Sequence, residues 1–248
     1  MPSGKVARIT GGGSGIGLAG ANELVKAGVR VVISGRTRKS LLEAEKKLKT
    51  LGNVEAVLLD VADKKAVASA AFDIEKRHGR IDILVNSAGT NLGKRNFKDV
   101  SAEGWDEVVA INLSGLFYCC HAVLPGMRSR KDGLIINISS WAGRYASALT
   151  GPAYNATKRA VIAVTESINI EECRNGIRAT SILPGEVATP IMEKRPVPPP
   201  PEERARMAQP EDLGAAILFV ASMPARSCVN ELIISPTWNR LVIGGLEK

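Results

Sequence analysis

Thr10-Gly11-Gly12-Gly13-Ser14-Gly15-Ile16-Gly17 follows a short apolar run and precedes a segment with helical periodicity. Glycines there let a backbone approach a diphosphate closely, and the first N–H groups of a helix can bind it. The spacing Gly11-x3-Gly15-x-Gly17 is not the G-x-G-x-x-G dinucleotide fingerprint, and a purely structural tight turn would use the same residues. Its position between the first strand and first helix of a β-α-β unit favours a dinucleotide site.

The rest of the chain alternates short apolar runs with longer segments of helical periodicity. Continuous apolar runs are typical of parallel strands covered on both faces, and successive β-α-β units wind into one sheet. The sequence therefore predicts one α/β domain over residues 1–248, a Rossmann-type doubly wound parallel sheet of about seven strands with helices on both faces. The predicted strands are residues 5–10, 30–34, 54–59, 81–86, 134–139, 177–183 and 231–235, and the predicted helices are residues 15–27, 40–50, 64–77, 102–130, 153–174 and 211–222.

Residues 184–210 break this alternation. They contain Pro184, Pro190, Pro196 and a proline run at 198–201, and proline at this density prevents a regular strand and shortens any helix. Because the segment follows the carboxyl end of a strand, we expect residues 186–209 to form a lid over a substrate cleft. A plain surface loop is the alternative.

The composition limits the classes of function that we expect for this protein. The formal charge is +8, but the basic residues are dispersed without interleaved aromatics, which favours a solvated basic surface over nucleic-acid binding; anionic substrates stay open. The four cysteines lack Cys-x-x-Cys spacing and the chain has two histidines, so we expect cysteines packed in the core and no zinc, haem or other metal site. No apolar run approaches about 20 residues and no signal-peptide pattern opens the sequence, which predicts a cytoplasmic protein without a membrane segment.

The end of the second predicted strand bears on the choice of dinucleotide. An NAD site commonly places a carboxylate about 20 residues beyond the glycines, where it binds the ribose 2′-hydroxyl. This sequence has Ser34-Gly35-Arg36-Thr37-Arg38 instead. An arginine can pair with a 2′-phosphate through two hydrogen bonds, so Arg36 favours NADP(H). The alternatives are that the cofactor is NAD(H), or that Arg36 is merely an exposed loop residue without a binding role.

Tyr154-Asn-Ala-Thr-Lys158 begins a strongly helical segment. A spacing of four places Tyr154 and Lys158 on one helix face. An ammonium near a phenol favours the phenolate and lowers the phenol pKa from about 10, which makes a general acid/base usable near neutral pH. Tyr-x-x-x-Lys alone is a weak motif.

With its companions the motif becomes specific, because the chain resembles the classical short-chain dehydrogenase/reductase family over nearly its whole length. The resemblance is carried by an ordered set of motifs: Thr10–Gly17, Asp60-Val61, Asn86-Ser87-Ala88-Gly89, Asn112, Ser139-Ser140, Tyr154–Lys158 and Pro184-Gly185. The resemblance implies that Tyr154 transfers the proton, and that Lys158 holds the nicotinamide ribose and lowers the tyrosine pKa. It implies that Ser140, rather than Ser139, binds the substrate oxygen, and that Asn112 organises a proton-relay water.

The family pattern also implies contacts to the dinucleotide. Asp60 matches the residue that contacts adenine, although it could merely cap the following helix. The residues implied in cofactor binding are Gly11, Gly13, Ser14, Gly15, Ile16, Gly17, Arg36, Asp60, Val61, Asn86, Ala88, Gly89, Tyr154, Lys158, Pro184, Gly185, Val187 and Thr189.

Two departures from the family pattern bear on the substrate and on the cofactor, respectively. Residues 231–240 lack the Asp-Gly-Gly ending common among 3-oxoacyl-carrier reductases and look more like hydroxyacid or serine dehydrogenase relatives; Ser14 stands where NADP-preferring members often have a basic residue. The expected activity is hydride transfer to or from a small carbonyl or secondary alcohol. The alternatives are a 3-oxoacyl-thioester reductase with an acyl carrier protein as partner, and a catalytically silent NADP-binding regulator.

The resemblance implies a homo-oligomer, a tetramer or dimer. The segments 91–97, 142–150 and 191–207, expected to line the substrate pocket, give no decisive charge signature.

Overall fold

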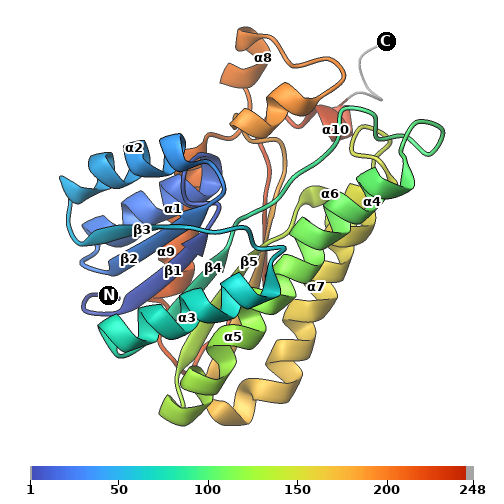
Figure 1. Ribbon diagram of the computed structural model, residues 1–248. Coiled ribbons are helices and arrows are strands. Elements are labelled where there is room, and N and C mark those ends of the chain that lie inside the picture. The colour runs from blue at the N-terminus through green and yellow to red at the C-terminus, as the bar shows by residue number, and fades with distance from the viewer. Residues whose placement is uncertain (1, 244–248) are drawn as a thin grey trace.

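The computed structural model describes residues 2–243, so Met1 and residues 244–248 of the predicted domain lie outside the described residues. Within residues 2–243, seven parallel strands form one sheet in the order β3-β2-β1-β4-β5-β6-β7 (Figure 1), which confirms the predicted doubly wound architecture. The strands lie within two residues of their predicted bounds. They are β1 Val6–Thr10, β2 Arg30–Gly35, β3 Val54–Leu58, β4 Ile83–Asn86, β5 Gly133–Ile138, β6 Ile177–Pro184 and β7 Glu231–Ile234.

Helices cover both faces of the sheet (Figure 1). The helices α1, α2 and α9 pack on one face, and α3, α5 and α7 pack on the other. The helix bounds are α1 Gly15–Lys26, α2 Arg38–Lys49, α3 Lys64–His78, α4 Ala102–Val109, α5 Gly115–Arg130, α6 Trp141–Arg144, α7 Pro152–Glu172, α8 Pro201–Ala205, α9 Pro210–Ser222 and α10 Arg240–Ile243, with a π-helix η1 Ala110–Ser114 and 3-10 segments η2 Cys173–Asn175 and η3 Pro190–Lys194.

The central strand β1 shows why the apolar runs become parallel strands. All five of its residues are buried, because successive side chains point to opposite faces and each face carries helices. Ala7 and Ile9 belong to the core beneath α1, α2 and α9, whereas Val6 belongs to the core beneath α3, α5 and α7. The direction of sheet growth reverses between β1 and β4, and the carboxyl ends of such strands border the usual ligand crevice of this architecture.

The predicted helix over residues 102–130 consists of α4, η1 and α5 in direct succession. This stretch is long and apolar enough to cross a membrane by length and composition, with a mean hydropathy of 1.6 over its most apolar 18 residues, which corrects the expectation that no apolar run approaches that length. Core helices of globular proteins pass the same test. Here Leu116, Cys119, Val123 and Met127 are buried against the sheet and α3, so the apolar face of α5 serves the core.

The cysteines divide into two kinds. Cys119 and Cys120 on α5 are buried, as predicted, and burial raises the pKa of the Cys120 thiol. The expectation of core packing is wrong for Cys173 and Cys228, which are exposed. The reason is their position at element ends, since Cys173 opens η2 and Cys228 lies in the loop before β7.

One of the buried charged side chains, that of Arg8, lies in the core between the sheet and the helices α3 and α5. Arg8 points from β1 toward α3 and α5 and is fully buried. Its Nη1 donates to the carbonyl oxygen of Val67 at 3.4 Å, whereas its Nε and Nη2 have no hydrogen-bond partner among the described residues. Burial lowers the pKa of this guanidinium, which expresses the cost of holding its charge away from water.

We expect Arg8→Met to stabilise the protein. Methionine follows the aliphatic stem of arginine and removes the poorly paired charge, which should raise the free energy of unfolding by about 1–4 kcal/mol. Urea denaturation followed by circular dichroism measures the change, with Arg30→Met on the exposed start of β2 as the control. An Arg8→Met protein no more stable than the control would show that the buried guanidinium is adequately solvated.

Candidate active site

The glycine-rich turn after β1 forms a cradle at the carboxyl edge of the sheet. Gly11 and Gly15 adopt the left-handed φ values +67° and +52°, which residues other than glycine rarely adopt. A Cβ on Gly17 would overlap the carbonyl of Gly11, and a Cβ on Gly11 would lie 2.9 Å from the backbone of Ser87 and Ala88. The missing side chains let the turn pack closely on its own backbone and on the end of β4. Gly11, Ser14 and Gly15 line a cavity at the start of α1, so the turn fits a dinucleotide diphosphate.

The end of β4 is tied to this cradle. Thr10 Oγ1 accepts hydrogen bonds from the backbone N–H groups of Ser87 at 3.2 Å and Ala88 at 3.1 Å. The same edge of the sheet is hollowed by a cavity of about 190 Å³, lined by Gly11, Gly13, Ser14, Gly35, Arg36, Thr37, Ser40, Leu41, Leu59, Val61, Ala88, Gly89 and Ile111. This cavity is where the adenosine half of a dinucleotide would lie.

Arg36 stands at the rim of this cavity. Its side chain is half exposed, and its Nη1 lies 3.9 Å from Oδ2 of Asp60. Asp60 itself is not among the residues lining the cavity; its Oδ1 accepts the N–H of Ala62 at 3.0 Å. The alternative role of Asp60 as the cap of the following helix is wrong, because Asp63 caps α3 by accepting the N–H groups of Lys65 and Ala66.

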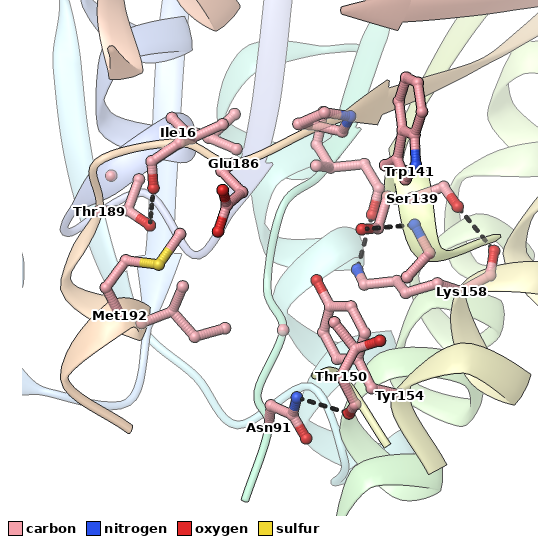
Figure 2. Close-up of a pocket in the computed structure, with 18 of the residues that line it drawn as sticks. Ile16, Asn91, Ser139, Trp141, Thr150, Tyr154, Lys158, Glu186, Thr189 and Met192 are labelled. Atoms are coloured by element: carbon pink, nitrogen blue, oxygen red, sulfur yellow. Dashed lines mark hydrogen bonds between the residues drawn. The ribbon is translucent and has the colours of Figure 1, made fainter. Parts of the chain in front are cut away.

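A larger cavity, of about 250 Å³, adjoins the first and shares Gly11, Ser14, Ala88 and Gly89 with it. Figure 2 shows Tyr154 and Lys158 on one side of this cavity, with Thr189 and Met192 on the other. Its lining contains Ser139 and Ser140 from the end of β5, and residues from the loops after β4 and β6. The two cavities share part of their lining and together form one groove at the carboxyl edge of the sheet.

The two serines after β5 have different surroundings. Ser139 is buried, and its Oγ donates to the carbonyl oxygen of Lys158 at 2.6 Å (Figure 2). Ser140 caps α6, where its Oγ accepts the N–H of Ala142 at 3.2 Å, and its hydroxyl interacts with the Tyr154 phenol. Both serines line the cavity, but the Ser139 hydroxyl is engaged by the backbone of Lys158, whereas the Ser140 hydroxyl interacts with the phenol.

Lys158 is buried beside the tyrosine. Its Nζ donates to the carbonyl oxygen of Ile138 at 2.8 Å and lies 5.5 Å from the centre of the Tyr154 ring. Burial lowers the pKa of Lys158 to about 8, because the interior disfavours the charged ammonium. This lysine is therefore only partly charged at mildly alkaline pH.

The expected lowering of the Tyr154 pKa by Lys158 is not what the structure shows. Burial raises the pKa of the Tyr154 phenol above its usual range. The interaction with Ser140 and the charges of Arg195 and Arg95 act in the opposite direction without cancelling this effect. Desolvation is the larger effect here because the phenol lies in the cavity wall, where a phenolate loses most of its hydration.

Asn112 lies behind the cavity, in the π-helical segment η1. Its Oδ1 accepts the N–H of Thr90 at 2.8 Å, and its Nδ2 donates to the carbonyl of Thr90 at 3.0 Å and to Thr157 Oγ1 at 3.4 Å. A Cβ on Gly89 would lie 3.5 Å from both Asn112 Oδ1 and Lys158 Nζ, so the amide and the ammonium face the same point of the backbone. A π-turn in a helix often marks a functional position.

The structure brings most of the predicted site residues together. Four of them do not line either cavity: Gly17, Asp60, Asn86 and Asn112. The Asn86 side chain is buried and donates to Asn137 Oδ1 at 2.9 Å. The predicted residues on the cavity walls are Gly11, Gly13, Ser14, Gly15, Ile16, Arg36, Val61, Ala88, Gly89, Ser140, Tyr154, Lys158, Pro184, Gly185, Val187 and Thr189.

Sequence reasoning missed three charged residues in the wall of the larger cavity: Arg95, Arg195 and Glu186. Arg95 and Arg195 fall in the segments expected to line the pocket, but other basic residues of those segments lie outside the lining, and no sequence pattern separates the two groups. Glu186 directly follows Pro184-Gly185 and could have been suspected from that neighbourhood alone.

Residues 184–195 reach this cavity by a short detour of the chain. The backbone N–H of Ala188 donates to the carbonyl of Ala208 at 2.9 Å, and the N–H of Ala208 donates to the carbonyl of Glu186 at 3.1 Å. These bonds close the base of the segment, and η3 and α8 lie within it. Short helices therefore form between the prolines, and Met192 of η3 lies in the cavity wall.

Comparisons with known proteins agree with this geometry. The family model for short chain dehydrogenase matches residues 5–198. An uncharacterised oxidoreductase of Staphylococcus saprophyticus is 34% identical over 235 residues, which cover 94% of this chain and 97% of that protein. The solved closed form of serine dehydrogenase complexed with NADP⁺ is 31% identical, with a TM-score of 0.84 over 93% of this chain and 94% of that one. The 3-ketoacyl-(acyl-carrier-protein) reductase of Brucella melitensis, complexed with NADH, is 29% identical, with a TM-score of 0.85 over 95% and 98% of the two chains.

Proposed function

Because this chain belongs to the short-chain dehydrogenase family, we propose that it is an NADP(H)-dependent oxidoreductase acting on a carbonyl or secondary-alcohol substrate. The observation that carries the proposal is one continuous groove. At one end it holds the glycine cradle and Arg36, and at the other Tyr154, Lys158 and Ser140. A cofactor cradle alone would suit a binding protein, and the polar groups at the other end argue against a catalytically silent regulator.

In the proposed mechanism NADP(H), when bound, supplies or accepts the hydride. Ser140 Oγ holds the substrate oxygen by a hydrogen bond and stabilises the negative charge that develops on it during reduction. The Tyr154 hydroxyl then donates its proton to that oxygen, and in the oxidation direction it takes the proton from the substrate hydroxyl. The hydroxyls of Ser140 and Tyr154 interact with each other and both residues line the cavity, so one substrate oxygen can contact both.

Lys158 and Asn112 would serve the proton supply. The ammonium of Lys158 stabilises the phenolate left after proton donation and contacts the nicotinamide ribose. Asn112 holds the Thr90 backbone and reaches toward Thr157, which is adjacent to Lys158. Its proposed role is to position a water molecule on the path from Lys158 to solvent, a role that acts through Lys158 and not on the substrate.

One of the similar solved structures contains NADP⁺ and another contains NADH, so the comparisons do not decide which dinucleotide this chain prefers. The proposed preference for NADP(H) therefore rests on Arg36. We expect Arg36→Asp to weaken NADPH binding by about ten- to hundredfold, since it removes a charge-assisted bond to the 2′-phosphate and adds repulsion. NADH affinity should stay level or improve. Fluorescence titration of both cofactors measures the change.

Lys47→Asp is the matched control, because it makes the same charge change at an exposed position farther along α2. Its NADPH affinity should fall far less than that of Arg36→Asp. A wild-type protein that prefers NADH, or an Arg36→Asp protein that keeps its preference for NADPH, would remove Arg36 from this role and leave NAD(H) as the cofactor.

Three further expectations stay proposals. Residues 186–209 are proposed as the substrate lid, supported by Val187, Thr189 and Met192 in the cavity wall. A homo-oligomer is proposed from the family, and exposed apolar side chains on outer helix faces, such as Phe117 on α5 and Ile170 on α7, support it. The 3-oxoacyl-thioester reductase with a carrier-protein partner remains the second candidate, supported by the similarity to the reductase of Brucella melitensis.

A further inference from the structure

The wall of the larger cavity contains a buried arginine with an incomplete set of partners. Arg95 is 6% exposed and comes from the loop after β4. Its guanidinium donates to two backbone carbonyls, those of Lys194 and, at 3.4 Å, of Leu149. Its Nε has no hydrogen-bond partner among the described residues, and no described carboxylate lies within 4.0 Å of its nitrogens. A buried charge of this kind is costly unless an anion neutralises it.

A second arginine increases the positive charge. Arg195 is 10% exposed at its side chain, and its Nη1 lies 2.8 Å from Glu186 Oε1. Glu186 is also held by Arg240, whose Nε and Nη2 donate to Oε2 at 2.6 Å and Oε1 at 2.8 Å. Arg240 also pairs with Glu203 through Nη1 and Oε2 at 2.6 Å, so two carboxylates balance Arg195 and Arg240, whereas Arg95 has no carboxylate partner among the described residues. The cavity keeps a surplus of positive charge even though Glu186 lines it.

This surplus charge lies close to the reacting group. Arg95 and Arg195 both act electrostatically on the Tyr154 phenol. Arg95 is also fixed with respect to that tyrosine, because Gly151, at φ +75°, passes directly against the Arg95 backbone three residues before Tyr154. A Cβ at Gly151 would overlap the Arg95 carbonyl. An anion bound at Arg95 would therefore sit at a set distance from the substrate oxygen held by Tyr154.

We propose that the cavity selects a small oxo acid or hydroxy acid, in which the carboxylate lies one or two bonds from the reacting carbon and binds Arg95. This inference rests on the proposed oxidoreductase function and names the substrate class for it. In the reduction, the oxo acid gains one hydride at its carbonyl carbon and one proton at its oxygen, and its carboxylate is unchanged. The cavity volume of about 250 Å³, part of which the nicotinamide would take, suits such a small substrate.

Matched acid and ester pairs test the proposal. NADPH consumption is measured with acetoacetate and methyl acetoacetate, and with pyruvate and methyl pyruvate. We expect the wild-type protein to favour at least one acid over its ester by about ten- to hundredfold in kcat/KM, the range of a buried charge-assisted bond. In Arg95→Met this ratio should fall toward one, mainly through a higher KM for the acid, while the ester is little changed.

Arg226→Met, an exposed arginine in the loop before β7, is the control and should keep the wild-type ratio. A binding readout accompanies the kinetics: calorimetric titration with malonate, an anion that has no ketone to reduce. Malonate should bind the wild-type and control proteins, and its affinity should fall at least tenfold in Arg95→Met. NADPH titration of Arg95→Met verifies that the variant retains its cofactor site.

The outcomes separate the two hypotheses. If the wild-type protein reduces the esters or neutral ketones as well as the acids, the carboxylate inference is overturned and the oxidoreductase function stands. If malonate binding depends on Arg95 but no carbonyl compound is reduced with either cofactor, the anion site stands and the proposed function fails. If malonate does not bind the wild-type protein, and that protein does not prefer acids over esters, the inference is overturned. Both results come from the wild-type protein, so they hold even if Arg95→Met does not fold.

Discussion

Replacing Tyr154 by phenylalanine is expected to lower kcat by about 10²–10⁴-fold, equivalent to roughly 3–5 kcal/mol of transition-state stabilisation. The substitution removes one hydroxyl, so the ring can keep its packing on the cavity wall. Neither the glycine cradle nor Arg36 is touched, and the dissociation constant for NADPH should stay within about twofold. Steady-state turnover and cofactor titration on the same preparation test both halves of this expectation.

Tyr118→Phe is the matched control for this experiment. Tyr118 lies on α5, packs against the core and does not line either cavity, so the same loss of a hydroxyl should leave turnover near the wild-type level. If Tyr154→Phe turned over as fast as Tyr118→Phe, the phenol of Tyr154 would not be the proton donor. Ser140, whose hydroxyl interacts with the phenol, would then be the group to test.

Lys158→Met is expected to impair both turnover and NADPH affinity, yet to stabilise the folded protein at neutral pH. The folded-state pKa of about 8 lies below the 10.5 of an unfolded lysine, so the unfolded chain binds more protons between these values. Stability contributed by Lys158 therefore rises with pH through this window, by about 3 kcal/mol in total. The advantage of Lys158→Met over wild type should be largest near pH 7 and vanish near pH 10.5.

Chemical denaturation of both proteins at several pH values between 7 and 10.5 measures this difference. Lys65→Met, at an exposed position on α3, provides the control and should show no such dependence. A constant difference between Lys158→Met and wild type across the range would mean that Lys158 keeps an ordinary pKa in the folded protein. The activity loss would then have to be explained by the lost ribose contact alone.

The architecture could be predicted from the sequence because short stretches of residues determine each strand, helix and turn. Each apolar run became a parallel strand, buried in the middle of the sheet and partly exposed in the edge strands β3 and β7, and the glycine turn became the left-handed turn at Gly11. The predicted proximity of Tyr154 and Lys158 also followed from one helical turn, since α7 carries both. Local spacing is sufficient wherever a single element sets the geometry.

The sequence did not predict features that depend on contacts between distant segments. The pKa of Tyr154 depends on burial by residues from several loops, and burial outweighs the neighbouring charges. Arg95 and Arg195 are separated by 100 positions and meet at one cavity only after folding. The burial of Arg8 in the core was equally hidden, because a single basic residue in an apolar run gives no sign of which face it occupies.

The π-turn at Asn112 has a consequence for how this chain could have arisen and how it could be redesigned. One extra residue in a helix shifts the rotational phase of everything after it by about 100°. Before η1, α4 buries Val108; after it, α5 buries Cys119, Cys120 and Val123. The π-turn thus offsets the buried face of α5 by a fixed angle from the face that an unbroken α-helix would bury. A redesign that removed the extra residue would turn α5 away from its core face and would move the amide that accepts the N–H of Thr90.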